Sequence, residues 1–253
     1  MSQRTKWLLR DPSPEAEARL FCLPYSGVGA SVFRRWPSHI GPLEVCPLQL
    51  PGRENRIGQP AYGDFPAFAA DAADALADHL DRPYAVFGHC MGSILAHALV
   101  TELRSRDVRQ PERLFVSSSR VPHWPPDRRY RMPAPGAVGV YHPSMTEEQL
   151  ADEVSRVSRT VGGTDLHPDL LPLALRVLRS DLEMCFGYAP ALAPTGCPIS
   201  TIGWSDDADV PPAEMGVWQE CGPVTHHVLP GDKLTFLEAP AELQEVVEKD
   251  FRG

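Results

Sequence analysis

Short apolar runs alternate with amphipathic stretches over much of the chain, and this alternation predicts strands separated by helices. The expected strands are residues 19–24, 43–50, 84–87, 113–119, 197–203 and 225–230. The expected helices are residues 30–39, 65–80, an alanine-rich stretch that runs to residue 99, and residues 239–251. Strands and helices that alternate at this spacing favour βαβ units. We therefore predict an α/β fold with a mostly parallel central sheet and helices on both of its faces.

The pattern changes between residues 121 and 198, where no run fits a strand. A loop rich in proline and arginine, residues 122–135, leads to expected helices at 146–161 and 168–188. Helices joined by such loops on one side of a sheet suit a lid over a site. We expect one α/β domain over residues 1–253, with residues 122–196 as a helical lid insertion. Ordinary packing helices are the alternative.

Composition limits which kinds of protein the chain can be and which kinds of partner it can bind. The chain has 253 residues, 43% of them hydrophobic, which is enough for one domain with a full core. A net charge of −9 disfavours nucleic acid and anionic membrane surfaces as partners. We expect no signal peptide and no membrane span, because no apolar run is long enough for either.

The cysteines and histidines predict neither a disulfide framework nor a metal site. The six cysteines are scattered and form no C-x-x-C pair, which favours reduced thiols and a cytoplasmic protein. His226 and His227 are neighbours on an expected strand, so their side chains point to opposite faces. No metal and no cofactor is expected.

Residues 84–99 carry the first candidate chemistry. An apolar run is followed by a tight turn between Gly88 and Gly92 and then by a helix, which is the context of a nucleophile elbow. The pattern is G-x-S-x-G, with Cys90 in place of the serine. A helix N-terminus favours an anion, so we expect it to lower the pKa of this thiol. Cys90 is the candidate nucleophile; a buried structural cysteine is the alternative.

Two backbone N–H groups and an acid would complete such a site. The N–H of Met91 follows the nucleophile, and a second would come from the loop after the first strand, at Ser26. The acid should follow a later strand, and residues 203–210 supply three carboxylates there. A histidine base should lie in the loop after the last strand, but residues 230–237 contain none. His226 and His227 come too early; we expect one to be buried and the other solvated or hydrogen-bonded, each in a structural role.

These motifs together resemble those of the type II thioesterases of polyketide and nonribosomal peptide assembly lines, which are α/β-hydrolases with a helical lid. L-P-Y-S-G at 23–27 resembles the family's F-P-Y-A-G-G, and L-P-G-R-E-N-R at 50–56 resembles L-P-G-R-x-x-R. G-H-C-M-G at 88–92 resembles G-H-S-M-G, and L-R-S-D-L at 178–182 resembles L-R-A-D-F. G-W-S-D-D-A-D-V at 203–210 resembles G-G-S-D-D-P-x-V, which places the triad acid on Asp207. The resemblance implies cleavage of acyl or aminoacyl groups from the phosphopantetheine thiol of a carrier protein.

The chain departs from this family at two positions. Cys90 replaces serine, and the closing P-G-G-H-F-F-L has become P-G-D-K-L-T-F-L, so the triad histidine falls on Lys233 or Leu234. A thiol needs a neighbouring base less than a hydroxyl does, so Cys90 could still take an acyl group. Lys233 could act as a base only if burial lowered its pKa well below about 10.4, and we expect a solvated loop lysine.

Three functions follow from these departures. Without a base, water would attack the acyl-enzyme slowly. The acyl group could then pass to a carrier thiol, to an amine or to a nucleophile in the chain itself, as in related cysteine-containing shuttles and Dieckmann-type cyclases. We therefore expect a thioesterase-family enzyme that releases its acyl group by hydrolysis or by transfer, including cyclising release. A non-catalytic protein that binds a carrier protein or a small ligand is the remaining alternative.

Overall fold

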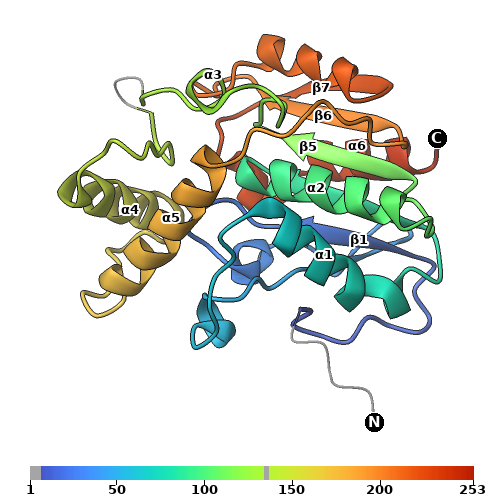
Figure 1. The fold of residues 1–253 in the computed structure, drawn as a ribbon, viewed down its shortest axis with the longest axis horizontal. Coiled ribbons are helices and arrows are strands. Elements are labelled where there is room, and N and C mark those ends of the chain that lie inside the picture. Colours follow the sequence, from blue (N-terminus) through green and yellow to red (C-terminus); the bar gives the residue numbers. More distant parts are fainter. Residues whose placement is uncertain (1–6, 134–136) are drawn as a thin grey trace.

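The fold is organised around one twisted sheet (Figure 1). The computed structural model describes residues 7–133 and 137–253, and within them the strand order is β2-β3-β1-β4-β5-β6-β7. All neighbouring strands are parallel except β2 and β3, which are antiparallel. The predicted mostly parallel sheet is confirmed. The strands are β1 Ala18–Leu23, β2 His39–Ile40, β3 Leu43–Pro47, β4 Tyr84–His89, β5 Arg113–Ser117, β6 Ile199–Trp204 and β7 Val224–Leu229.

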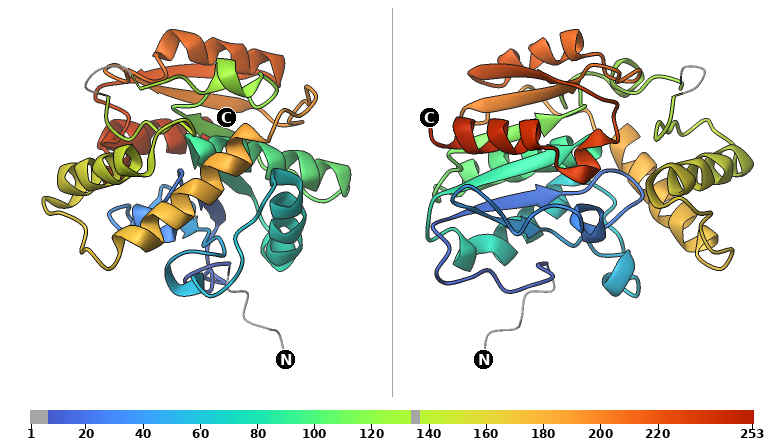
Figure 2. Two further views of the ribbon diagram at one scale, coloured as in Figure 1. Left: turned by 60° about the vertical axis from the view of Figure 1, so that its left-hand side comes forward. Right: turned by 180° about the vertical axis from the view of Figure 1, so that it is seen from behind.

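Helices cover both faces of the sheet (Figures 1 and 2). On one face lie α1, Phe65–Leu76, and α2, Met91–Ser105; on the other lies α6, Ala241–Phe251. Every residue of β1, β4 and β6 is buried, because both faces of these strands are covered. Alternate residues of one strand therefore belong to two separate cores. This explains why the strands read as continuous apolar runs.

The predicted helix over residues 30–39 is wrong. The chain forms a short 3-10 helix, Ala30–Phe33, and then the two-residue strand β2. Pro37 explains the interruption, because a proline disfavours helical backbone at the residue before it and has no N–H to donate.

The described part of residues 122–196 contains no strand, as predicted, and three helices, of which the short first one lies within the predicted loop 122–135. They are α3, Pro126–Arg129; α4, Glu147–Gly162; and α5, Leu171–Phe186. The helices α4 and α5 lie beyond the carboxyl ends of the strands (Figure 1) and pack together through leucine side chains. The interpretation of residues 122–196 as an insertion into one domain stays a prediction. None of the helices in the described ranges has the length and apolar character that a bilayer crossing needs.

Candidate active site

Cys90 lies at the sharp turn between β4 and α2. Its backbone angles are φ 53° and ψ −118°, a strained conformation for a residue with a side chain. A Cβ atom at Gly88 would lie 2.1 Å from the carbonyl oxygen of Gly92, and one at Gly92 would lie 2.3 Å from that of Leu23. Both positions therefore require glycine. The Cys90 N–H donates to the carbonyl of Ser117 at 2.9 Å, which ties the turn to β5. The chain has the backbone geometry of a nucleophile elbow.

The thiol of Cys90 is half-buried, whereas the five other cysteines are buried; all six are free. Burial raises the pKa of Cys90, and the carboxylates of Asp209 and Asp207 add to the rise. The ammonium group of Lys233 and the N–H of Met91 oppose it. The expectation that the helix N-terminus lowers the pKa of Cys90 below its usual value is therefore wrong, because desolvation outweighs that effect. Cys90 rests as a neutral thiol near pH 7.

The loop after β1 is fixed by a buried ion pair. The N–H of Gly27 donates to Asp181 Oδ2 at 2.8 Å. Arg53 donates to both oxygens of Asp181, at 2.8 and 2.7 Å, and to the carbonyl of Val28 at 3.0 Å. The side chains of Arg53 and Asp181 are only 4% and 3% exposed. This network, the loop brace, holds residues 26–28 in place against α5.

The sequence reasoning assigned no role to Arg53 or Asp181, although both lie in motifs that carry the family resemblance. The sequence signal that could have pointed to them is their place in the L-P-G-R and L-R-S-D motifs. The brace contacts Gly27 and Val28 and so fixes the loop at Ser26, which is buried three residues after β1. Ser26 and Met91 stay the predicted oxyanion donors.

Asp207 is the buried carboxylate of the loop after β6, with 5% of its surface exposed. Its Oδ1 accepts hydrogen bonds from the N–H groups of Asp209 and Val210, at 2.9 and 3.0 Å. Its Oδ2 is buried and has no hydrogen-bond partner among the described residues. This free oxygen is the feature expected of an acid whose histidine partner is missing.

Lys233 points inward from the loop after β7, and the expectation of a solvated lysine is wrong. Its side chain is 7% exposed, and its Nζ donates to Asp209 Oδ2 at 2.6 Å. Burial alone would lower the pKa of Lys233, but Asp209, with smaller effects of Cys90 and Asp207, raises it above its usual value. Because β6 and β7 are neighbours, the loops that follow them meet, and the lysine finds its carboxylate there. Lys233 is thus a fixed cation and no general base.

The histidines near the sheet have structural partners. His226 is exposed and its Nδ1 lies 2.7 Å from Thr201 Oγ1. His227 is half-buried and its Nε2 lies 2.6 Å from Asp250 Oδ2. The expectation that one of the two is buried is wrong, because β7 is an edge strand of the sheet.

His89 precedes Cys90 but is held in the core. Its ring stacks on Phe236, with 3.8 Å between the ring centroids, and its Nδ1 lies 3.0 Å from Ser117 Oγ. Burial, together with the charge of Lys233, lowers its pKa well below the usual value. His89 therefore stays neutral.

Comparison with known proteins identifies the family. A model of the thioesterase domain matches residues 18–251. The chain belongs to the thioesterase family. It is 32% identical to the linear gramicidin dehydrogenase LgrE of Brevibacillus parabrevis, over 98% of this chain and 94% of the relative. It is 30% identical to the gramicidin S biosynthesis protein GrsT of Aneurinibacillus migulanus, over 100% and 96%.

A solved structure agrees with this assignment. The type II thioesterase BorB from the borrelidin biosynthetic cluster superimposes with a TM-score of 0.79 over the full length of both chains, at 26% identity. The resemblance inferred from the motifs is confirmed: this thioesterase is an enzyme of the α/β-hydrolase superfamily. Its homologues are thioesterases of polyketide and nonribosomal peptide biosynthesis.

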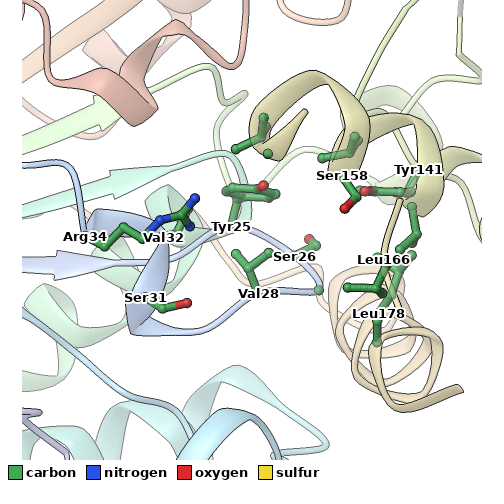
Figure 3. Close-up of a pocket in the computed structure, with 16 residues that line it drawn as sticks. Tyr25, Ser26, Val28, Ser31, Val32, Arg34, Tyr141, Ser158, Leu166 and Leu178 are labelled. Carbon is green, nitrogen blue, oxygen red and sulfur yellow. The ribbon is translucent and has the colours of Figure 1, made fainter. Parts of the chain in front are cut away.

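The thioesterase has a cavity of about 290 Å³ between the loop after β1 and the helices α4 and α5 (Figure 3). Ser26 lines it on one side, and Val157 of α4 and Leu178 of α5 line it on the other. Most of its wall is apolar. Such a cavity, with a polar backbone at one end, suits the acyl part of a thioester.

Proposed function

We propose that this thioesterase acts on acyl or aminoacyl thioesters that a carrier protein holds on its phosphopantetheine arm, through a covalent acyl group on Cys90. The observation that carries the proposal is the placement of Cys90: a strained elbow at a helix N-terminus, with the braced loop at Ser26 facing an apolar cavity. The relatives in peptide and polyketide biosynthesis support a carrier protein as partner. The six free cysteines are consistent with the proposed cytoplasmic location.

Acyl transfer to Cys90 exchanges one thioester for another. Cys90 first loses its proton to solvent, and its thiolate sulfur attacks the carbonyl carbon. The N–H groups of Met91 and Ser26 stabilise the oxyanion that forms. The bond to the phosphopantetheine sulfur then breaks, and the departing thiolate takes up a proton from solvent. The Lys233 ammonium stabilises the Cys90 thiolate before the attack. A titrating base is not needed for this step.

Release of the acyl group is the step that the missing histidine affects. The pKa of Lys233 is raised, so this residue holds its proton and cannot take one from an attacking water. The acyl-enzyme should therefore persist until a better nucleophile arrives, which favours transfer or cyclising release over hydrolysis. The raised pKa of Cys90 supports the second candidate, a protein that binds a carrier or a small ligand without chemistry.

Intact-mass measurement tests the proposal. The protein is incubated with an acyl-N-acetylcysteamine thioester, or with an acylated carrier protein, and its mass and the free acid are followed over time. We expect a persistent adduct of one acyl group that is absent from Cys90→Ala and present in Cys46→Ala. Rapid turnover to free acid would indicate hydrolysis. No adduct and no turnover across several acyl groups would overturn the covalent mechanism in favour of binding alone.

A further inference from the structure

A second cavity lies on the opposite side of the site, where the histidine of a triad is missing. It has a volume of about 220 Å³ and is lined by residues from 137–140, 206–209 and 232–234. Leu234 in its wall packs in the same apolar cluster as Cys90. Lys233, Asp209 and Asp207 in its wall act electrostatically on Cys90, so the cavity lies near the thiol, although Cys90 itself does not line it. It is separate from the apolar cavity under α4 and α5, with which it shares no lining residue.

The charges in this second cavity do not balance. Four aspartates and one lysine line it. Lys233 is matched by Asp209, and the pair is buried. Asp207 has no such partner: its Oδ2 is buried without a hydrogen bond among the described residues. A buried carboxylate oxygen in this state is costly unless a donor reaches it, so the cavity is built for a ligand with a positive or strongly donating group.

A nitrogen ligand fits these features better than a metal ion does. The described residues contain no group of three or more histidine, cysteine or acidic side chains placed to hold a metal. An anion would meet a net negative wall. A primary amine has an N–H to donate to Oδ2 in both its protonated and its uncharged form.

We propose that a primary amine binds in the second cavity through Asp207 Oδ2 and accepts the acyl group from Cys90. This inference rests on the proposed function, since it needs the Cys90 acyl-enzyme. It makes the enzyme an acyl transferase that forms amides.

The step balances without a further reactant. The uncharged amine, held by one N–H on Asp207, attacks the carbonyl carbon of the Cys90 thioester and forms the C–N bond. The C–S bond breaks, and Cys90 leaves as a thiolate that Lys233 stabilises. The proton that the nitrogen loses passes to that thiolate. The products are an amide and the free thiol of Cys90.

Single-turnover discharge tests the inference. Cys90 is first loaded from an acyl-N-acetylcysteamine thioester and freed of excess reagent. n-Propylamine is then added over a range of concentrations, and amide, free acid and remaining adduct are measured by mass spectrometry. We expect amide to form at a rate that saturates with amine concentration. n-Propanol, of the same shape but with a less nucleophilic oxygen in place of the nitrogen, should form no ester at a comparable rate.

Two further measurements make the test specific. In preloaded Asp207→Asn the half-saturating amine concentration should rise by about 10- to 100-fold, the value of a lost hydrogen bond to a charged group. Asp78→Asn, at an exposed residue outside the cavity, is the matched control and should change it little. Trimethylamine, which can donate to Oδ2 when protonated but cannot form an amide, should compete with n-propylamine in the unaltered enzyme.

The outcomes separate this inference from the proposed function. A rate that rises linearly with amine, without competition by trimethylamine, would show solution aminolysis and overturn the amine site while Cys90 loading stands. Free acid as the only product would do the same. Failure of Cys90 to load at all would overturn the proposed function, and the amine site with it.

Discussion

The two sides of Cys90 differ in how far they depart from the thioesterase motifs. On one side, the loop after β1 carries the expected residues, and the buried pair of Arg53 and Asp181 holds it to α5. On the other side, the loops after β6 and β7 have lost the histidine, and a buried pair of Lys233 and Asp209 stands in its place. The first side would stabilise the oxyanion that forms at the thioester carbonyl. The second side is where a base would take up and return the proton.

This difference indicates which step the chain retains. Stabilising an oxyanion needs fixed donors, and a buried brace supplies rigidity for them. Moving a proton needs a group whose pKa lies near the working pH, and Lys233 and Asp209 are both shifted away from it. The site is therefore equipped to capture an acyl group and poorly equipped to give it to water. Three kinds of variant test this difference: one that restores a histidine, one that breaks the Arg53–Asp181 pair and one that removes the charge of Lys233.

The largest effect is expected from Lys233→His. An imidazole at this position could donate to the free Oδ2 of Asp207 and act as a base. We expect hydrolysis of the Cys90 acyl-enzyme to accelerate by about 10²- to 10⁴-fold, the usual contribution of a general base. The decay of the preloaded adduct measures it. Leu234→His is the matched control for the other possible position; if neither variant accelerates decay, the assignment of this corner as the base position fails.

Loosening the braced side should cost stability first. Asp181→Ala leaves the buried Arg53 guanidinium without its carboxylate, and we expect a loss of about 3–5 kcal/mol in the free energy of unfolding. Release of residues 26–28 should also slow the loading of Cys90 by about 10²-fold, the value of one oxyanion donor. Urea unfolding and the loading rate measure the two effects.

An exposed ion pair provides the control for this variant. Asp165 pairs with Arg159 at the surface, so Asp165→Ala should change the free energy of unfolding by less than about 1 kcal/mol. If Asp181→Ala lowers stability but leaves the loading rate intact, the brace is structural and does not position the oxyanion donors.

The smallest effect concerns the thiol. Because the pKa of Cys90 is raised, its thiolate fraction and its rate of alkylation by iodoacetamide should rise about tenfold per pH unit between pH 6 and 8. Lys233 opposes the rise in the pKa of Cys90. Lys233→Met should therefore raise the pKa of Cys90 further and slow its alkylation at pH 7 by about tenfold. Peptide mass spectrometry resolves Cys90 from the buried cysteines. A plateau beginning below pH 7 in the unaltered protein would show a lowered pKa and contradict the assignment.

Local patterns predicted most of the fold because the physical causes are local. Apolar runs gave the strands of a sheet covered on both faces, and the spacing of Gly88 and Gly92 around Cys90 predicted the elbow, since any side chain there would meet backbone. The failure at residues 30–39 came from Pro37, whose effect on the backbone outweighed the apolar spacing.

What the sequence determined by itself was the identity of the candidate reacting groups: a cysteine at the elbow, an aspartate after β6 and no histidine after β7. Tertiary structure alone decided their state. Lys233 and Asp209 are 24 residues apart, and Arg53 and Asp181 are 128 apart, so no local pattern shows that each pair meets. The charge and pKa of a group depend on burial and on such distant partners. Only the fold could make the lysine a fixed cation and leave Asp207 with one oxygen to which none of the described residues donates.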